Sequence, residues 1–275
     1  MLFQRRFRPV IGLDITTSSI KLIELTRSGD SYRVESYAAE PSPPNAINEK
    51  AIVDAQAVGE AVRRAVKRAG ARSRECAVAV SGDAAITKVI QMPRNLRASE
   101  LESQVEMQAD QYIPFPMEEV SYDFEVIGPS EKDPEMLDAL LVATRSENVE
   151  QRQAAGQAAG LTARIVDVEA FALENACRLL THQMPDGGME RSIAVVDFGA
   201  SSTTFSVLRD TKVAYTRDFS FGGQQLTEEI MRTYGLSMEE AGRAKKEGGL
   251  PANYQSEVLD PFIDDMCQQV SRSLQ

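Results

Sequence analysis

Two short copies of one pattern hold the residues with the clearest chemical potential. Each copy is an apolar strand that ends in an aspartate, then a turn of small hydroxyl residues and a second apolar strand. The copies are Val10–Leu22, with Asp14, and Val195–Leu208, with Asp197. One such hairpin is an ordinary turn. Small residues let the backbone come close to a ligand, backbone amides bind phosphate oxygens, and carboxylates hold a metal ion through water. Two copies therefore predict two lobes that face one polyphosphate, with Asp14 and Asp197 as the residues that hold its Mg²⁺.

Three further features fit the same chemistry, each with a plainer alternative. Gly222-Gly223 precedes a predicted helix and would let a phosphate approach its N-terminus, although a glycine pair is usually only a turn. Lys21 follows the first turn and could reach a phosphate oxygen, or it is an exposed lysine on an alternating strand. Asp167 and Glu169 precede another helix, where a carboxylate could orient a water. The alternative for Glu169 is a first-turn residue that the helix dipole favours.

Composition excludes several classes of function. The 275-residue chain has a formal net charge of −11 and a sequence pI near 4.8, which argues against a nucleic-acid partner, because phosphates demand a basic face. Basic residues gather only on one predicted helix and near the N-terminus, where we expect a solvated face and a frayed end. They are Arg63, Arg64, Lys67, Arg68, Arg5, Arg6 and Arg8. No apolar run approaches the ~20 residues of a membrane span, and no Walker A or GxGxxG pattern occurs.

Cysteine and histidine chemistry is also limited. Cys76, Cys177 and Cys267 form no CxxC pair, and we predict buried thiols in a reducing cytoplasm. The single histidine, His182, lies in a loop-like stretch and is expected to be exposed. A histidine metal cluster is therefore excluded, and a Ser-His-Asp triad would have to use this one residue.

Hydrophobic periodicity divides the chain into two lobes and an insert. The first lobe begins with three predicted strands and a helix that Gly70 ends. Their bounds are Val10–Ile15, Ile20–Leu25, Tyr32–Tyr37 and Ala51–Ala69. The insert, residues 76–162, has the predicted order β-β-α-β-β-α, and a capping box of Ser99 and Glu102 should start its first helix. Its elements are Ala77–Ser81, Ile86–Met92, Ser99–Tyr112, Val120–Ile127, Leu137–Thr144 and a helix from Ser146 to Gly160.

The remaining segments complete the first lobe and form the second. Residues 1–75 and 163–190 are assigned to the first lobe and residues 191–275 to the second. The predicted elements are Thr162–Val168, Phe171–Leu180, Ile193–Phe198, Thr203–Leu208, Lys212–Phe219, Leu226–Tyr234, Ser237–Glu247 and Glu257–Leu274. The sequence therefore predicts an α/β fold of two lobes that carries an α+β insert.

The paired hairpins, the glycine pair and the insert together resemble the actin-like ATPase superfamily. Its members carry two phosphate hairpins on opposed lobes and a Gly-Gly turn near the nucleotide. The insert resembles the branch shared by the division protein FtsA and the pilus protein PilM. Three phrases resemble the PilM family in particular: Ile11–Ile15, Gln111–Val120 and Ile165–Leu173. The resemblance covers nearly the whole chain and implies an actin-like two-lobe fold with an FtsA-type inserted subdomain.

The resemblance also implies site residues. The two phosphate loops would be formed by Asp14, Thr16, Thr17, Ser18 and Lys21, and by Asp197, Gly199, Ala200, Ser201 and Ser202. Gly222 and Gly223 would lie near the sugar and phosphates, and Lys245 would contact the ribose or base. The candidate catalytic residues are Asp14, Asp167 and Glu169.

Three departures from the family pattern bear on nucleotide binding. Thr16 replaces a common glycine, so the first loop is expected to be tighter. Gly242 replaces a glutamate that meets the ribose, which removes a hydrogen bond worth ~0.5–1.5 kcal/mol. The family continues beyond the position of Gln275 with the strand and turn of the adenine wall. We therefore expect this sequence to be a shortened form.

The function implied by the resemblance is that of a cytoplasmic adaptor peripheral to the inner membrane, which binds ATP and Mg²⁺. It would bind the cytoplasmic N-terminal tail of PilN in a groove between first lobe and insert, with Ser99–Tyr112 and adjacent strands as candidate lining. It would link PilN to the pilus motor ATPases for pilus assembly and twitching motility, with slow or incidental hydrolysis. The alternatives are an ATP hydrolase, with Asp167 or Glu169 positioning the nucleophile, and an FtsA-like division protein that self-associates.

Overall fold

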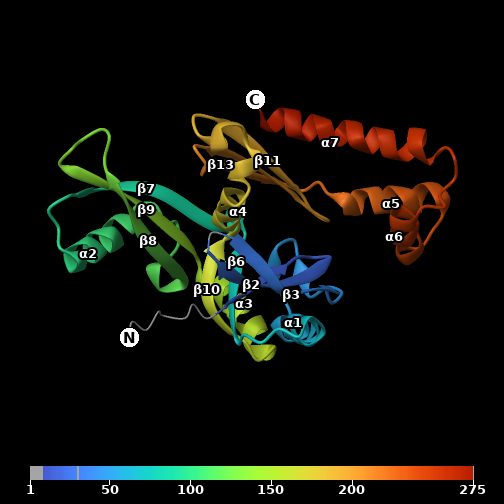
Figure 1. Cartoon of the computed structure of the whole chain (residues 1–275), viewed down its shortest axis with the longest axis horizontal. Coiled ribbons are helices and arrows are strands. Elements are labelled where there is room, and N and C mark those ends of the chain that lie inside the picture. Colours follow the sequence, from blue (N-terminus) through green and yellow to red (C-terminus); the bar gives the residue numbers. More distant parts are fainter. Residues whose placement is uncertain (1–8, 30, 275) are drawn as a thin grey trace. The chain divides into compact units, whose positions relative to one another are not determined.

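The computed structural model describes residues 9–29 and 31–274. The chain divides into two compact units, residues 1–169 and 170–275. Figure 1 shows the order of their elements along the chain. The basic run at Arg5–Arg8 lies outside the described residues. Among the residues described, no helix is long and apolar enough to cross a membrane.

The first unit is built on a five-stranded mixed sheet with the strand order β10-β6-β1-β2-β3. The strands are β1 (Ile11–Ile15), β2 (Ser19–Ser28), β3 (Ser31–Pro41), β6 (Glu75–Val80) and β10 (Thr162–Val168). β1, β2 and β3 form the predicted antiparallel meander, whereas β6 runs parallel to both β1 and β10. The carboxyl ends of β1, β6 and β10 therefore meet at one edge of the sheet.

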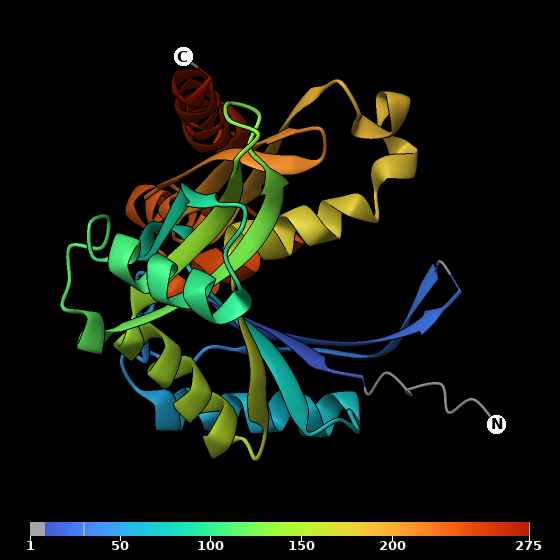
Figure 2. The same cartoon turned by 90° about the vertical axis from the view of Figure 1, so that its left-hand side faces the viewer.

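Two helices cover one face of this sheet. Helices α1 (Ala55–Ala69) and α3 (Ser146–Ala158) lie on the same side of it in Figure 2, and their buried residues join those of β1, β2 and β6 in one core. The helices approach closely at Gly59, where an added Cβ would lie 2.4 Å from the Cβ of Ala158. A glycine at this position thus sets the spacing of the helix layer.

Helix α1 begins four residues later than predicted. The side chain of Asp54 accepts a hydrogen bond from the Ala57 N–H at 2.9 Å and caps the helix. The residues before it form a short hairpin of β4 (Ile47–Asn48) and β5 (Ala51–Ile52). Gly70 ends the helix in the left-handed conformation, as predicted.

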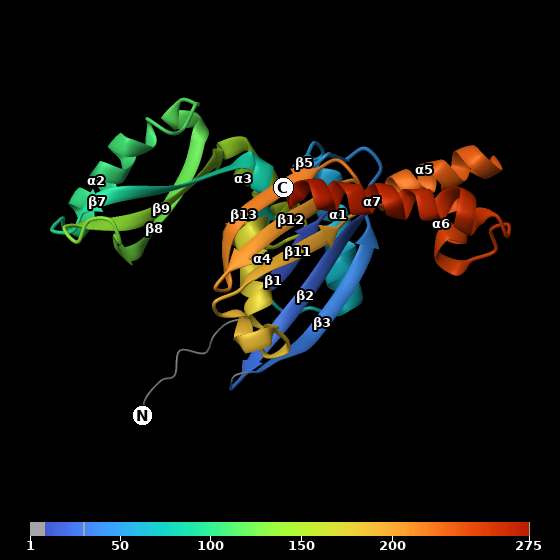
Figure 3. The ribbon, with the colours of Figure 1, turned by 90° about the horizontal axis from the view of Figure 1, so that it is seen from above.

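A second sheet, with the order β7-β9-β8, forms a layer of its own within this unit. Strands β7 (Ala85–Pro93), β8 (Val120–Pro129) and β9 (Met136–Arg145) carry helix α2 (Ala98–Ala109) on one face. Figure 3 shows this arrangement, and residues 85–145 are called the inserted module below. The predicted capping box of Ser99 and Glu102 is wrong. Helix α2 starts at Ala98, and the Glu100 carboxylate accepts from the Arg97 N–H at 2.8 Å.

The predicted element order of the insert is confirmed, but its elements belong to two layers. The strand predicted to open it, β6, pairs with β1 and β10 in the first sheet. The helix predicted to close it, α3, packs on α1 in the core of that sheet. The reason is register: Ala77 of β6 pairs with Gly12 on one side and Ile165 on the other, so β6 is the central link of a parallel sheet. Local periodicity carries no information on which sheet a strand joins.

In the described residues of the second unit, a three-stranded sheet is followed by helices α5, α6 and α7. Strands β11 (Ser192–Phe198), β12 (Thr203–Arg209) and β13 (Lys212–Phe219) form an antiparallel sheet in chain order. Helices α5 (Gly223–Tyr234) and α6 (Met238–Glu247), with a π-helical turn at Gln255–Leu259 that leads into α7 (Asp260–Ser273), share a small core. Ser237, predicted as the first helical residue, instead caps α6: its hydroxyl accepts a hydrogen bond from the Glu240 N–H.

Helix α4 (Glu169–Arg178) differs from its predicted assignment. We expected it in the first lobe, but from Ala170 onward it belongs to the second unit. The Glu174 carboxylate accepts a hydrogen bond from the Val213 N–H at 2.7 Å, which attaches α4 to strand β13. The short turns at Thr181–Gln183 and Pro185–Gly188 then lead into β11.

The structure tests the expectations for cysteine and histidine. Cys76 and Cys177 are buried, and burial raises the pKa of the Cys76 thiol to about 11, which suppresses the reactive thiolate at neutral pH. The prediction of three buried thiols is wrong for Cys267, which is exposed on α7. His182 is exposed, as expected.

The close approach of α1 and α3 gives a testable pair of substitutions. Gly59→Ala should lower the free energy of unfolding of the first unit by about 1–3 kcal/mol, because its Cβ meets Ala158. Gly242→Ala, in α6, meets nothing within 4 Å and should stabilise its helix by about 1 kcal/mol. Denaturant unfolding of both variants checks this. A neutral Gly59→Ala would contradict the packing described.

Candidate functional site

The Asp14 hairpin consists of β1, the turn Thr16–Ser18 and β2. Asp14 and Lys21 are cross-strand partners, and their side chains form an ion pair at 2.8 Å. Both side chains are about half exposed, at 54% and 48%. Since an exposed ion pair is worth at most ~1 kcal/mol, Lys21 can exchange the carboxylate for a phosphate oxygen at small cost. The sequence predicted both residues at this site but not their pairing.

The turn itself is closed by the hydroxyl group of Thr16. This hydroxyl donates to the Ser19 carbonyl oxygen at 2.8 Å and accepts from the Ser19 N–H at 3.2 Å. Ser42, from the chain after β3, donates its hydroxyl to the Thr16 carbonyl at 2.6 Å and its N–H to the Ser18 carbonyl at 3.2 Å. Thr16 does not have a positive φ, so threonine replaces glycine without backbone strain. The turn is tight, as expected, and its carbonyl groups are turned toward Ser42.

Strand register places Asp14 and Asp167 on one face of the first sheet. Asp167 pairs with Ala79 of β6, and Gly12 of β1 pairs with Ala77 of the same strand. Alternation puts Asp14, Ala79 and Asp167 on the face opposite α1 and α3, whose core takes Leu13 and Val78 instead. The two aspartates therefore lie on one sheet face, on the two strands that flank β6. Carboxylates on one face could share a Mg²⁺ through its water shell.

Glu169 lies in a different environment from Asp167. Its carboxylate pairs with Lys50 at 3.2 Å, where the two side chains are 38% and 20% exposed. Asp167 instead accepts a hydrogen bond from the Val168 N–H at 2.8 Å. From the sequence, both carboxylates were candidates to orient a water. The structure brings Asp167 onto the same sheet face as Asp14, whereas Glu169 pairs with Lys50 of the β4–β5 hairpin.

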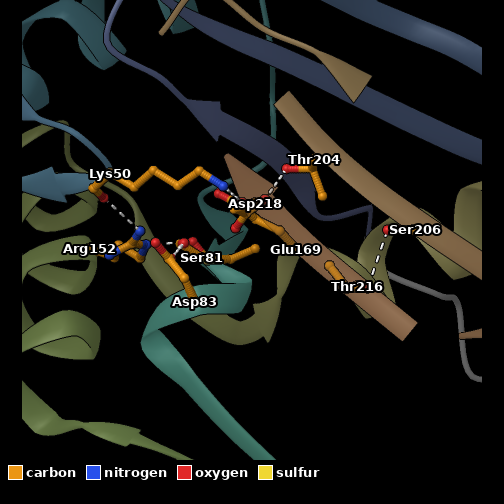
Figure 4. A network of polar contacts seen from close by, with 10 residues as sticks. Lys50, Ser81, Asp83, Arg152, Glu169, Thr204, Ser206, Thr216 and Asp218 are labelled. Atoms are coloured by element: carbon orange, nitrogen blue, oxygen red, sulfur yellow. Dashed lines mark hydrogen bonds and ion pairs between the residues drawn. The ribbon is translucent and has the colours of Figure 1, made fainter. Parts of the chain in front are cut away.

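The Asp197 hairpin of the second unit joins β11 to β12. Its turn, Gly199–Ser202, is closed by a hydrogen bond from the Gly199 N–H to the Ser202 carbonyl at 3.0 Å. Asp197 is exposed and pairs across the strands with Thr204, whose hydroxyl donates to Asp218 of β13 (Figure 4). The turn residues predicted to bind phosphate, including Ala200 and Ser201, are therefore presented on a short, hydrogen-bonded loop.

Gly222 and Gly223 pack directly on this turn. The Gly223 N–H donates to the Gly199 carbonyl at 3.0 Å, and the Gln224 N–H donates to the Ala200 carbonyl at 2.8 Å. A Cβ added to Gly222 would lie 2.4 Å from the Ala200 carbonyl oxygen. Gly222 is therefore required by the close approach of two backbones, which is more than a turn alone would need. The contact fixes the N-terminus of α5 beside the hairpin, and it uses the first two N–H groups of the helix.

Lys245 joins the same group of residues. Its ammonium group donates to the Gly223 carbonyl and to the Thr227 hydroxyl, each at 2.7 Å. Burial lowers the pKa of Lys245, and the nearby charge of Lys246 lowers it further. Lys245 thus holds the glycine turn while it stands beside the predicted phosphate loop.

Three aromatic rings pack together next to the Asp197 hairpin and the Gly222–Gly223 turn. Phe198 follows Asp197, Phe221 precedes Gly222, and Phe262 comes from α7. The Phe221 and Phe262 rings stack with centroids 5.1 Å apart, and Phe198 meets them edge-on at 6.0 and 6.1 Å. The hairpin, the glycine turn and α7 are thereby held together inside the second unit.

Sequence reasoning missed three residues that the structure brings to these sites. Ser42, between Pro41 and Pro43, anchors the first turn, and its position in a proline segment after the meander was the only signal. Lys50 pairs with Glu169, and Arg152 binds the Lys50 carbonyl at 3.2 Å. Nothing in their local sequence marks either residue, because both contacts join segments about a hundred residues apart.

The donor chemistry of each unit fits the predicted ligand. Within the described residues, no group of three or more His, Cys, Asp or Glu could form a direct metal centre. Asp14 and Asp197 are exposed single carboxylates on tight turns, which suits a Mg²⁺ held through water and through phosphate.

Comparisons with known proteins are consistent with this geometry. A family described as type IV pilus assembly protein PilM matches residues 12–275. The chain is similar to a solved structure of a PilM-PilN type IV pilus biogenesis complex, with a TM-score of 0.77 and 29% identity over 96% of this chain and 76% of that one. It also shares its fold with EutJ of Carboxydothermus hydrogenoformans, with a TM-score of 0.58, 16% identity, and coverage of 100% and 74%.

A curated relative lies in the same branch. The chain is 26% identical to the cell division protein FtsA of Bacillus subtilis over 261 residues, which is 87% of this chain. The chain spans only 58% of the length of that relative. Together these similarities confirm the predicted actin-like fold class and the relation to FtsA.

The contact at Gly222 yields a matched pair of variants. Gly222→Ala should lower the free energy of unfolding of the second unit by about 1–3 kcal/mol, because the Ala200 carbonyl must move. Gly223→Ala should change it by less than about 0.5 kcal/mol, since its nearest neighbour, the Lys245 ammonium, lies at an ordinary 3.6 Å. Thermal unfolding and amide exchange at residues 223 and 224 measure both effects. Equal effects of the two substitutions would refute the close packing of the turn.

Proposed function

Because the chain belongs to the family of type IV pilus assembly proteins PilM, we propose that it is an adaptor of a type IV pilus machinery that binds the cytoplasmic N-terminal tail of PilN. The observation that carries this proposal is the similarity to the PilM-PilN complex over 96% of the chain. In this proposal the protein is cytoplasmic and reaches the inner membrane through its partner, because its net charge of −11 would be repelled by anionic lipid.

The inserted module supports a role in peptide capture. Its sheet has two edge strands, β7 and β8, and an extended peptide can add to such an edge. Large apolar side chains are exposed on α2 and the strands: Val89, Met107, Tyr112, Tyr122, Val126 and Ile127. Tyr122 and Val126 lie on the face of β8 that is turned toward α2, as their pairing with Ala143 and Ala139 shows. We place the peptide along β8 and α2.

Nucleotide is the second ligand in this proposal. In this proposal the Asp14 hairpin of the first unit would contact Mg²⁺ and phosphate. The second unit has a candidate phosphate loop of its own, in the Asp197 hairpin and the Gly222–Gly223 turn. Bound nucleotide would shift the population of lobe arrangements in proportion to its differential affinity for them. Coupling of PilN to the pilus motor ATPases, pilus assembly and twitching motility would follow from that shift.

A slow ATP hydrolase is the second candidate function, favoured by one observation. Asp14 and Asp167 lie on the same face of the first sheet, where one carboxylate can hold Mg²⁺ and the other can orient a water. Glu169 is paired with Lys50 and is the weaker choice for this role. Loss of hydrolysis in Asp167→Asn with retained ATP binding would support the hydrolase. A rate equal to that of the unmodified protein would remove Asp167 from it.

Peptide binding tests the adaptor directly. A synthetic PilN-type N-terminal peptide titrated into the chain by calorimetry should bind, and Tyr122→Ala should weaken its affinity about tenfold through loss of an apolar contact. Val34→Ser, on the exposed part of β3, is the matched control and should leave the affinity unchanged. No binding by the folded chain, with or without Mg-ATP, would overturn the adaptor.

Nucleotide binding is tested separately. Asp14→Asn should weaken Mg-ATP affinity by about tenfold or more, because a charge-assisted contact to the metal shell is lost. Asp264→Asn, an exposed aspartate of α7, removes the same charge and should have no effect. Calorimetry at fixed Mg²⁺ measures both. Equal affinities for the two variants would exclude Asp14 from the site and leave the peptide result intact.

A further inference from the structure

A chain of polar contacts begins at the root of the inserted module. Thr144, near the end of β9, is only 8% exposed. Its hydroxyl donates to the Ala84 carbonyl at 2.7 Å, immediately before β7 begins. The same hydroxyl accepts from the Asn148 side-chain amide of α3 at 3.0 Å. The two strands that connect the module to the first sheet are therefore joined to helix α3 through one hydroxyl group.

Arg152, one turn further along α3, continues the chain. It is 5% exposed, and its guanidinium donates to three backbone carbonyls: those of Asn148 at 3.1 Å, Lys50 at 3.2 Å, and Ala79 at the end of β6. Figure 4 shows it between Lys50 and the turn that contains Ser81 and Asp83. The planar guanidinium fixes its donors in one geometry. Arg152 therefore holds α3, β6 and the β4–β5 hairpin in register with one another.

The chain ends at Glu169. Lys50 offers its carbonyl to Arg152 and its ammonium to the Glu169 carboxylate at 3.2 Å. The Lys50 side chain is 20% exposed and the Glu169 side chain 38%, so solvent partly screens this pair. Glu169 is the first residue of α4 and the last residue of the first unit. The contacts thus lead from the module root to the point where the chain passes between its two units.

We propose that Thr144, Asn148, Arg152 and Lys50 form a polar relay that couples the inserted module to the position of Glu169. In the relay Arg152 and Lys50 are positioning residues. Each member holds one group on either side, so a displacement of the strands at Ala84 is passed to α3, then to the β4–β5 hairpin and then to Glu169. The relay consists of contacts within the chain alone. The relay can therefore be tested without PilN and without nucleotide.

Amide hydrogen exchange on the full chain tests the relay. The amides of residues 173–176 in α4 report on its first turn, because they bind the carbonyls of residues 169–172. Lys50→Met should raise their exchange rates about fivefold to tenfold through loss of the Glu169 contact, and Lys50→Arg should restore them. Thr144→Val, which has no contact with α4, should raise the same rates by a smaller factor.

The double variant is the decisive measurement. If the two sites are independent, the exchange rates at residues 173–176 in the double variant rise by the product of the two single-variant increases. A relay instead predicts that Thr144→Val combined with Lys50→Met raises these rates by well below that product. Arg164→Met, which removes an exposed pair with Glu75 at 3.3 Å, is the matched control and should leave residues 173–176 unchanged.

Two results would overturn the relay. One is a Thr144→Val variant in which exchange rises near Ala84 and Asn148 but not at residues 173–176. The other is a double variant whose factor equals the product. If Thr144→Val fails to fold, as judged by circular dichroism, Asn148→Ala replaces it in both measurements, because it breaks the next contact of the relay.

Discussion

The parallel pairing of β6 between β1 and β10 is the constraint on which the first unit depends. It joins segments that begin at residues 11, 75 and 162, and so requires the intervening chain to leave the sheet and return. It sets Gly12, Ala77 and Ile165 in one row, and alternation places Asp14 and Asp167 on the same face of the sheet. Both the chemistry of the open face and the root of the inserted module follow from this one register.

The opposite face of the sheet explains why that register is stable. Helices α1 and α3 bury the alternate residues of β1 and β6, and they approach at Gly59 more closely than any side chain would allow. A one-residue slip of β6 would exchange Cys76 and Val78 for Ala77 and Ala79 in the core, so the apolar face selects the pairing. The position of the polar residues on the other face is thus a consequence of core packing.

A close contact between two backbone loops shapes the second unit. In the Asp197 hairpin and the Gly222 turn, carbonyls and amides of two loops meet directly, and only glycine leaves room at Gly222. Lys245 and the three phenylalanine rings hold this contact from two further segments of the unit. The loop that we assign to phosphate is therefore preorganised by groups that lie outside it, which reduces the ordering cost of binding.

The buried guanidinium of Arg152 has the same role in the first unit. It satisfies three carbonyl groups from three different elements, which a lysine with its single ammonium group could not do in the same geometry. Its neighbour Lys50 connects this centre to Glu169. Positioning of a carboxylate thus depends on residues that come from distant parts of the chain.

The sequence by itself determined the strands and helices, the two Asp hairpins, the glycine stop at Gly70 and the family, because these depend on periodicity and on short patterns. It placed helix starts less well, since Asp54 and Glu100 cap through contacts that compete with other local signals. Only the tertiary structure decided that β6 and α3 leave the insert for the first sheet. It alone separated Asp167 from Glu169 and brought Arg152 to Lys50. These outcomes depend on pairing and packing between distant segments, which no local pattern encodes.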